Sequence, residues 1–457
     1  MFHAGEHMGK DRDFTSGKIL GPFLLFSIPI IFALFLQFLY GAIDLMIVGK
    51  FSDPTEVSAV ATGSQIMTML TTLTSSLAMG VTIFLGEKIG EKKGDEAGLI
   101  TGNGIFLFLV FGIALTVVMS VGAVAFSGLM NAPAQAFQST VYYVRVCGLG
   151  SIVIVLYNLI GSIFRGLGDS RTPLITVIIA TCCNVVGDLL LVAVFHMGAL
   201  GAAIATVAAQ LISVLASWWM IKRKDLPFVM TRQSLRPNKE ILKKILGLGT
   251  PIALQDFLVN LSFLIILAIV NVLGVAPSAG VGISERIVTL LMLVPIALMQ
   301  SMSAFVAQNR GAKRYDRAWK VLQYSIVVST VFGVVMFILA FFYGDVLAKF
   351  FVDDPSVIAA AADYMKAYGV DCLLTCFMFC LIGFLNGMEL TKLVMVQGII
   401  GAFFVRVPIS FIMSRQEPVS LFHIGLATPA SSTVQIAICV IALLWLKRKI
   451  KETFHHD

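Results

Sequence analysis

The sequence predicts an all-α polytopic membrane protein with twelve transmembrane helices in two pseudo-symmetric six-helix bundles. Three observations predict this fold class: the chain is very apolar, membrane-length apolar segments recur along it, and parts of its first half reappear in the second. Of its 457 residues, 58% are hydrophobic and 13% are charged, and the mean hydropathy is +0.92. Soluble chains carry roughly a quarter charged residues, and the segments are too long and too uniformly apolar for the alternating strands of a membrane barrel.

Twelve segments are long and apolar enough to cross a bilayer core, which takes about 20 residues of helix. Six of them precede a polar stretch, residues 222–243, which we interpret as a cytoplasmic linker, and six follow it. We therefore expect an N-terminal lobe over residues 1–221 and a C-terminal lobe over residues 244–457. The expected spans are 19–49, 57–85, 99–128, 138–164, 172–195, 199–221, 244–273, 280–307, 320–344, 357–385, 393–414 and 421–446.

The Lys and Arg residues predict the orientation of the chain. The termini, the linker and every second connection hold 26 of them, whereas the opposite connections hold only Lys50, Lys349 and Arg415. Because basic loops stay in the cytoplasm, we expect both termini there, in a multi-pass protein of a prokaryotic inner (plasma) membrane. The net charge of +7 is then loop charge, and no nucleic-acid partner is expected.

An internal repeat relates the two halves. Residues 90–97 read GEKKGDEA and residues 311–318 read GAKRYDRA, and a shift of 221 residues also aligns Gly166 of FRGLGD with Gly387 of FLNGME. A repeat of six spans keeps its orientation in the membrane, which predicts two bundles related by an axis along the membrane normal.

Two acids lie inside predicted spans, Asp44 late in the first and Asp188 late in the fifth. A carboxylate in hydrocarbon costs several kcal/mol, so it persists where it faces a bundle interior and handles an ion or a proton. The topology places both acids, and Thr206 of the sixth span, ~8–11 Å below the outer boundary. Tyr40 and Asn184 each lie one helical turn before one of the acids, on the same face.

These five side chains allow three interpretations. They form a set of oxygen donors suited to Na⁺, or a carboxylate pair in which one member holds a proton because burial and the neighbouring acid oppose a second negative charge. The third interpretation is that each acid only completes a local hydrogen-bond network. Pro29 precedes Asp44 by fifteen residues in the same helix, where it removes a hydrogen bond and creates either a hinge that responds to the site or a static kink.

Four segments, taken in order, resemble the multidrug and toxic compound extrusion (MATE) family over essentially the whole chain. They are the P…D…VG pattern of residues 29–49, RGLGDSRTP at 165–173, N-x-x-x-D at 184–188 leading into GALGAAIAT at 198–206, and AQNRGAKRYDRA at 307–318. Each is short, but their order and spacing together are specific. The resemblance implies twelve helices in two lobes and the exchange of H⁺ or Na⁺ for xenobiotics.

The resemblance also implies a cation site in the first lobe. The DinF-like branch of the family uses a Tyr and an Asp of the first helix, an Asn and an Asp of the fifth, a Thr of the sixth and a kink proline in the first. The matching positions here are Tyr40, Asp44, Asn184, Asp188, Thr206 and Pro29.

The chain departs from the NorM-like branch, which places acids in the seventh and tenth helices. The counterparts here are Val259 and Thr375, neither of them acidic, while Asp256 and Asp371 lie about one turn away. This departure favours the first lobe as the cation site and puts a second-lobe site in doubt.

Other charged or metal-capable residues receive simpler interpretations. Arg406 in span eleven contacts substrate, an acid or lipid, or is structural, and Glu285 and Arg286 are expected to be solvated near the outer end of span eight. Three cysteines, at 372, 376 and 380, share a helix face, but no His or acid completes a ligand set, so no metal site is expected.

The residues favour a cation-coupled antiporter that exports amphipathic, often cationic, drugs and xenobiotics by alternating access. We expect no cofactor beyond the coupling ion (H⁺ or Na⁺), small organic substrates, a lipid bilayer as surroundings and a monomer. The alternative is a lipid-linked saccharide flippase of the related superfamily, but such proteins carry a basic central cavity and the buried ionisable residues here lean acidic. The chain contains neither a membrane enzyme's metal-binding cluster, such as DDxxD or HExxH, nor an ATP-binding P-loop, so we expect no enzyme.

Overall fold

The computed structural model describes residues 13–224, 226–228 and 230–455, and this part of the chain is built from helices without any strand. Ten helices are individually long and apolar enough to cross a membrane, and the described residues give twelve spans if each of two bent helix pairs counts as one. The predicted all-α membrane fold is thus confirmed. The predicted cytoplasmic N-terminus, residues 1–12, lies outside the described residues.

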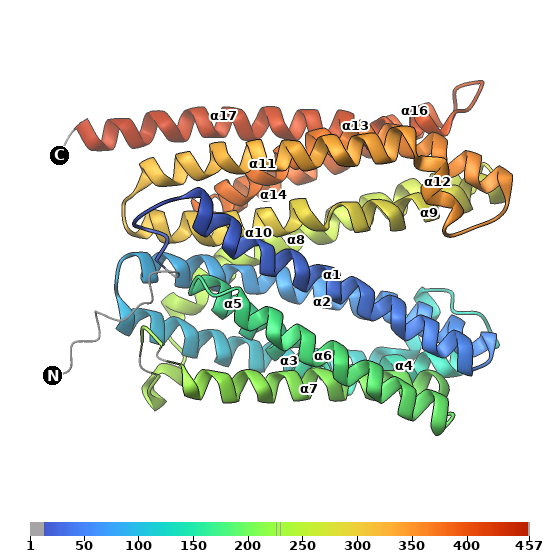
Figure 1. Ribbon diagram of the computed structural model, residues 1–457, viewed down its shortest axis with the longest axis horizontal. Helices are drawn as coiled ribbons and strands as arrows, with labels where there is room; N and C mark the ends of the chain where they lie inside the picture. The colour runs from blue at the N-terminus through green and yellow to red at the C-terminus, as the bar shows by residue number, and fades with distance from the viewer. Residues whose placement is uncertain (1–12, 225, 229, 456–457) are drawn as a thin grey trace. The chain divides into compact units, whose positions relative to one another are not determined.

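The first six spans follow the predicted segments (Figure 1). The chain passes through α1 (Leu20–Phe51), α2 (Pro54–Gly90), α3 (Gly94–Leu129), the bent pair α4 (Phe137–Leu149) and α5 (Ser151–Gly166), α6 (Arg171–Asp188) with its π-helical continuation η1 (Leu189–Val194), and α7 (Gly198–Arg223). A short 3₁₀ helix, η2 (Arg232–Leu235), lies in the predicted linker.

The second half of the chain also provides six spans, with its bent pair in the second place instead of the fourth. They are α8 (Lys239–Asn271), the bent pair α9 (Val275–Leu291) and α10 (Leu293–Gly311), α11 (Tyr315–Phe342), α13 (Pro355–Gly387), α14 (Thr391–Ile399) with the π-helix η3 (Ile400–Arg406) and α15 (Val407–Met413), and α16 (Leu421–Gly425) with α17 (Ala427–His455). A six-residue helix, α12 (Gly344–Lys349), joins α11 to α13.

Proline and acidic residues fix several helix starts. Pro54 and Pro355 stand at the first helical positions of α2 and α13, where a missing N–H costs nothing and φ is already suitable. Asp354 caps α13 by accepting hydrogen bonds from the backbone N–H groups of Ser356 (2.8 Å) and Val357 (3.4 Å). These local signals end one helix and begin the next within a few residues, which leaves short connections between the spans.

Two predicted spans are bent. The α4–α5 pair turns by 54° at Gly150, where a Cβ would lie 2.5 Å from a methyl of Val207. The α9–α10 pair turns by 43° at Met292, three residues before Pro295, which cannot supply the next helical N–H. The spans predicted as 138–164 and 280–307 are therefore broken helices.

The chain divides into two compact units. The first comprises residues 1–253 with 311–313, and the second comprises residues 254–310 with 314–457. The helix α8 thus begins in the first unit, where it packs closely on α2: a Cβ on Gly80 would lie 2.6 Å from the Ile245 carbonyl oxygen, and one on Gly249 would overlap the Leu77 carbonyl oxygen. Each unit has its own apolar core, around Val60 and Val144 in the first and around Val270 and Cys372 in the second.

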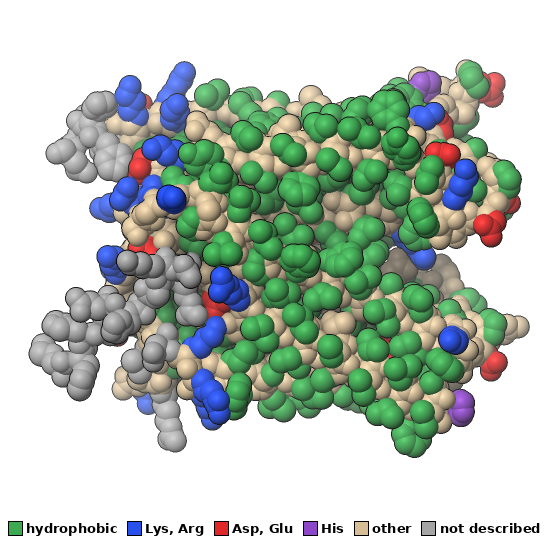
Figure 2. Space-filling view, viewed as in Figure 1, with side chains coloured by type: hydrophobic (Ala, Val, Ile, Leu, Met, Phe, Trp, Pro, Cys, Tyr) green, Lys and Arg blue, Asp and Glu red, His purple; other side chains and the backbone are tan. Residues whose placement is uncertain are grey.

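The outer surfaces of the helices are apolar along their middle. Leu, Ile, Val and Phe side chains of α3, α6, α7, α11 and α17 are exposed, and in Figure 2 hydrophobic side chains cover the central part of each unit's visible face while Lys, Arg, Asp and Glu gather toward the helix ends. Because a hydrocarbon core tolerates an apolar surface and rejects charge, this distribution agrees with helices that cross a membrane.

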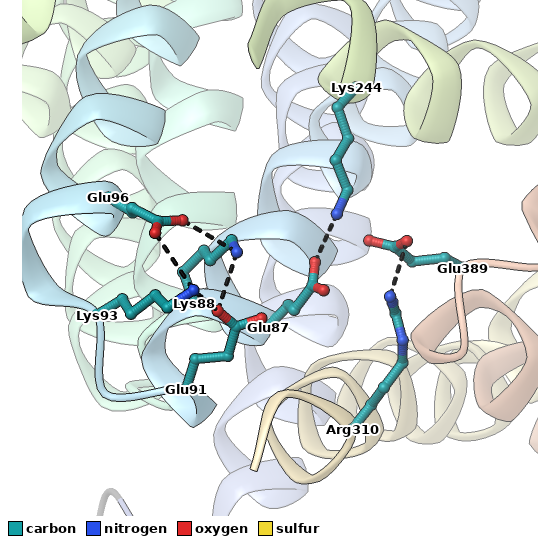
Figure 3. Close-up of polar contacts among 8 residues, drawn as sticks. All are labelled: Glu87, Lys88, Glu91, Lys93, Glu96, Lys244, Arg310 and Glu389. Carbon is teal, nitrogen blue, oxygen red and sulfur yellow. Dashed lines mark hydrogen bonds and ion pairs between the residues drawn. The ribbon is translucent and has the colours of Figure 1, made fainter. Parts of the chain in front are cut away.

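Ion pairs surround the connection between α2 and α3 (Figure 3). Lys88 pairs with Glu91 (2.9 Å) and Glu96 (3.0 Å), and Lys93 pairs with the same two acids at 2.8 and 3.3 Å. This network holds the tight turn in which Lys92 adopts a positive φ of 59°.

A further ion pair fastens the start of α8 to α2. The Lys244 Nζ lies 2.7 Å from Glu87 Oε2 and 4.3 Å from the centre of the Phe84 ring. In the second unit, Arg310 at the end of α10 pairs with Glu389 at 2.9 Å.

The loop between α5 and α6 is organised by Asp169. Its carboxylate accepts hydrogen bonds from the backbone N–H groups of Arg171 and Thr172 (both 3.1 Å), from the Thr172 hydroxyl (2.7 Å) and from Lys224 Nζ (2.6 Å). Burial raises the pKa of Asp169, but the hydrogen bonds from Lys224 and Thr172 outweigh it and hold the pKa below its ordinary value. Asp169 therefore both caps α6 and ties the end of α7 to it.

Candidate functional site

The two predicted acids lie side by side inside the first unit. Asp44 projects from α1 and Asp188 from the last position of α6, and their carboxyl groups interact electrostatically with each other. Asp44 is 3% exposed and Asp188 is fully buried. The structure thus brings together in space two acids that are 144 positions apart in the sequence.

The other three predicted residues border this pair. The Asn184 side-chain amide, one turn before Asp188, donates to the Thr206 hydroxyl of α7 at 3.5 Å. Tyr40, one turn before Asp44, faces Thr206 with its hydroxyl. All five residues predicted from the sequence therefore belong to one cluster where α1, α6 and α7 meet.

Several oxygens of this cluster have no hydrogen-bond donor among the described residues. They are the Tyr40 hydroxyl, Oδ1 of Asp44, Oδ1 of Asn184 and both carboxylate oxygens of Asp188. Buried polar atoms without partners are rare in folded proteins, because each loses its bonds to water. A carboxylate pair with unused oxygens is suited to holding a positively charged partner, either a proton shared between the acids or a metal cation with oxygen ligands.

Two residues of α4 complete the surroundings and were not predicted. Tyr143 and Cys147, one turn apart, are 2% and 1% exposed, and both interact electrostatically with Asp44. Their neutral side chains belong to an apolar segment, so neither charge nor spacing marked them in the sequence. They close the side of the site that faces α4.

The backbone of α6 changes at the site. The α-helix ends at Asp188, and the next six residues, Leu189–Val194, form a π-helix. Single π-turns inside helices are uncommon and occur often at functional sites. Pro29, the predicted hinge, is buried within α1, and the helix continues through it from Leu20 to Phe51.

In the second unit, Asp371 of α13 is buried. Its carboxylate accepts hydrogen bonds from the hydroxyls of Ser432 (2.6 Å) and Thr375 (3.0 Å). Arg406 is buried as well and donates to Ser262 Oγ at 3.0 Å. Glu285 was expected to be solvated, but its Oε1 is buried. This oxygen is covered because α9 packs on α13, where Tyr364 lies near Glu285.

Comparison with known proteins gives consistent matches along the chain. The family model described as MatE matches twice, over residues 29–190 and over residues 251–412. The probable multidrug resistance protein YoeA of Bacillus subtilis is 23% identical over 444 residues, which cover 93% of this chain and 94% of that protein. The multidrug export protein MepA of Staphylococcus saprophyticus is 23% identical over 407 residues, 88% of each chain.

The fold also matches solved structures. One, described as the outward-facing conformation of a multidrug resistance MATE family transporter of the MOP superfamily, superposes with a TM-score of 0.89 at 19% identity, over 98% of this chain and 99% of that one. The agreement covers both halves of the chain and supports the predicted repeat of six spans.

Proposed function

The chain belongs to the MatE family of multidrug efflux transporters, and on this premise we propose that it exports amphipathic, often cationic, organic molecules in exchange for H⁺ or Na⁺ by alternating access. Asp44, Asp188, Asn184, Thr206 and Tyr40 bind the coupling cation.

The observation that carries this proposal is the pairing of two buried carboxyl groups with unused oxygens. Asp44 and Asp188 adjoin each other, and Oδ1 of Asp44 and both oxygens of Asp188 have no donor among the described residues. Two negative charges at this separation repel strongly in a medium of low dielectric constant. One cation bound between them removes most of that repulsion, so the occupied and empty states of the site differ greatly in energy.

Either cation suits the chemistry of the cluster. A proton on one carboxyl group makes it a donor to the other, and Na⁺ is a hard cation that takes oxygen ligands such as those of Asn184, Thr206 and Tyr40. Binding to the acids alters the electrostatic interaction between α1 and α6, the two helices that carry them. A change of this kind gives the antiporter two states whose balance the cation controls.

Pro29 supplies a point at which α1 can bend in response. It lies fifteen residues before Asp44 in the same helix, and a proline inside a helix removes one backbone hydrogen bond. We take neutralisation of the acids to shift the balance between straight and bent forms of α1 and so to favour release of the exported molecule.

The distribution of Lys and Arg supports an orientation with both termini in the cytoplasm. The cation site then lies toward the outer side of the membrane, within reach of external H⁺ or Na⁺. A gradient directed inward across the cell membrane would drive the exchange.

The test uses the purified protein in proteoliposomes loaded with a fluorescent lipophilic cation such as ethidium. Transport is followed with no gradient, with a pH gradient alone and with a Na⁺ gradient alone. We expect one of the two gradients to accelerate movement of the dye against the cation flow. Equal rates under all three conditions would show a facilitator instead of an antiporter.

A further inference from the structure

The two halves can be compared residue by residue near the ends of the family matches. Both matches have the same length, and their first and last residues are each 222 positions apart. The first residues are Pro29 and Pro251, which lie inside α1 and α8. Near these prolines, a shift of 222 residues therefore aligns α1 with α8. At the other end of the matches, the same shift aligns the end of α6 with η3 and α15.

This register locates the second-half counterpart of the candidate cation site. Its acids have been replaced by neutral side chains, and a basic side chain occupies the place of the amide. The pairs are Tyr40 with Ser262, Asp44 with Ile266, Asp188 with Ser410 and Asn184 with Arg406.

The structure agrees with the pairing. Arg406 Nη1 donates to Ser262 Oγ at 3.0 Å, so the counterparts of Asn184 and Tyr40 meet across the bundle. The guanidinium group also lies over the Phe263 ring, 4.3 Å from its centre. Arg406 is only 4% exposed, and its Nε has no acceptor among the described residues. The positive charge is thus held in place inside the second unit.

Asp371 supplies the compensating negative charge. It is 3% exposed. It attracts Arg406 electrostatically, but the two charged groups are more than 4 Å apart and so do not form a direct ion pair. The shift of 221 that aligns Gly166 with Gly387 in the middle of the repeat places Asp371 at the position of Gly150. At the paired positions the first half therefore has two acids and no base, whereas the second half has the base Arg406 and no acid. Asp371 lies outside these paired positions.

The other titratable groups that interact with Asp371 or Arg406, or with the tyrosines beside them, come from two helices. On α9, Glu285 has one buried oxygen, Oε1, without a donor among the described residues. On α13 itself, the groups that interact with Asp371 or Arg406 are Tyr364, Tyr368, Cys372 and Cys376. Of these groups, Glu285 is the one acid besides Asp371, and it does not belong to the repeat counterpart of the first site.

We propose that the Arg406 guanidinium is a tethered cation that takes, in the second half of the chain, the place of the coupling cation bound by Asp44 and Asp188 in the first half. Asp371 is its fixed partner. The second half is therefore permanently neutralised at this position, and only the first half exchanges its cation during transport. This inference rests on the proposed coupling function and assigns Arg406 the role of restricting coupling to one site.

The experiment measures the thermal unfolding midpoint of the purified protein as a function of Na⁺, replaced by choline at constant ionic strength, and as a function of pH. The parent variant is Asp44→Asn/Asp188→Asn, in which we expect the cation-dependent shift of the wild type to be lost. Adding Arg406→Gln removes the positive charge that compensates Asp371 and should create a new cation-dependent shift. Adding Asp371→Asn as well should abolish it, and Arg406→Lys, which keeps the charge, should not create it.

Two outcomes would overturn the proposal. One is a cation-dependent shift that persists in Asp44→Asn/Asp188→Asn and disappears with Asp371→Asn, because the second half would then bind a cation with Arg406 in place. The other is that Arg406→Gln, added to the parent variant, folds but shows no new cation-dependent shift. A new shift that Glu285→Gln removes and Asp371→Asn leaves in place would count in the same way, because the cation would then bind at Glu285.

A second measurement covers an Arg406→Gln protein that does not fold. In Asp371→Asn with Arg406 intact, the proposal expects a lower unfolding midpoint but an unchanged half-saturating cation concentration in the efflux assay, and a changed half-saturating concentration would overturn it. The two proposals fail separately. If the wild type shows no gradient-driven efflux, the proposed coupling function is wrong. The cation-dependent shift in unfolding midpoint expected from Arg406→Gln still tests whether Arg406 acts as a tethered cation.

Discussion

The ion pair between Glu87 and Lys244 gives a prediction whose size can be worked out from the structure. The two charged atoms are 2.7 Å apart, and the side chains are 10% and 34% exposed. Exposed pairs contribute ~0–1 kcal/mol, and breaking a fully buried pair costs ~3–5 kcal/mol. Because Glu87 is nearly buried and Lys244 is partly solvated, we expect a coupling free energy of about 1–2 kcal/mol between them, consistent with a hydrogen bond between charged groups.

A double-mutant cycle isolates this pair from the other interactions of each residue. It uses Glu87→Gln, Lys244→Met and the double variant, with the free energy of unfolding measured by SDS titration in mixed micelles. A matched cycle at Lys349 and Asp345, which are 3.6 Å apart and 60% and 50% exposed, should give a coupling near zero. If the Glu87–Lys244 coupling is no larger than that of the exposed pair, the ion pair does not fasten α8 to α2 and this reasoning is wrong.

Three further predictions concern packing, pH and orientation. Gly249→Ala places a methyl group against backbone and should lower the free energy of unfolding by ~1–3 kcal/mol, whereas Gly247→Ala, which has open space around its Cβ position, should raise it by up to ~1 kcal/mol; SDS titration compares the two. Because the pKa of Asp169 is lowered in the folded protein, its stabilisation is present above its unfolded pKa of ~3.9 and is lost as pH falls through the folded pKa. The difference in unfolding free energy between the wild type and Asp169→Asn should thus stay constant from neutral pH to about pH 5 and shrink at lower pH. In a cysteine-free background, an impermeant maleimide added to intact cells should label Val275→Cys, 86% exposed, and miss Gln233→Cys, and the opposite pattern would invert the topology.

The buried acids were predictable because charge is conspicuous in an apolar segment. Asp44 and Asp188 each interrupt a membrane-length run, and helical periodicity then identifies Tyr40 and Asn184 on the same faces. Their common depth followed from counting spans and residues, and the structure places the four side chains together with Thr206. The number and order of the spans followed in the same way, since each requires about 20 apolar residues.

The sequence could not show features that depend on backbone geometry or on neutral contacts. Hydropathy is the same for a straight and a bent span, so the break at Gly150 left no signal, nor did the π-helix after Asp188. The break at Met292 lies near Pro295, which the sequence does show. Tyr143 and Cys147 approach Asp44 only because α4 packs on α2 and α7 in the folded bundle. Arg406 was visible as a charge in a span, but its meeting with Ser262 requires the tertiary structure.

The central claim is that Asp44 and Asp188 form the coupling site. It is tested most directly by measuring cation-driven dye efflux in proteoliposomes containing Asp44→Asn or Asp188→Asn, beside Asp345→Asn as an exposed acid given the same change. We expect both site variants to fold and insert normally and to lose gradient-driven efflux, and Asp345→Asn to behave as the wild type. Efflux at the wild-type rate in either site variant, under the same gradient, would contradict the claim.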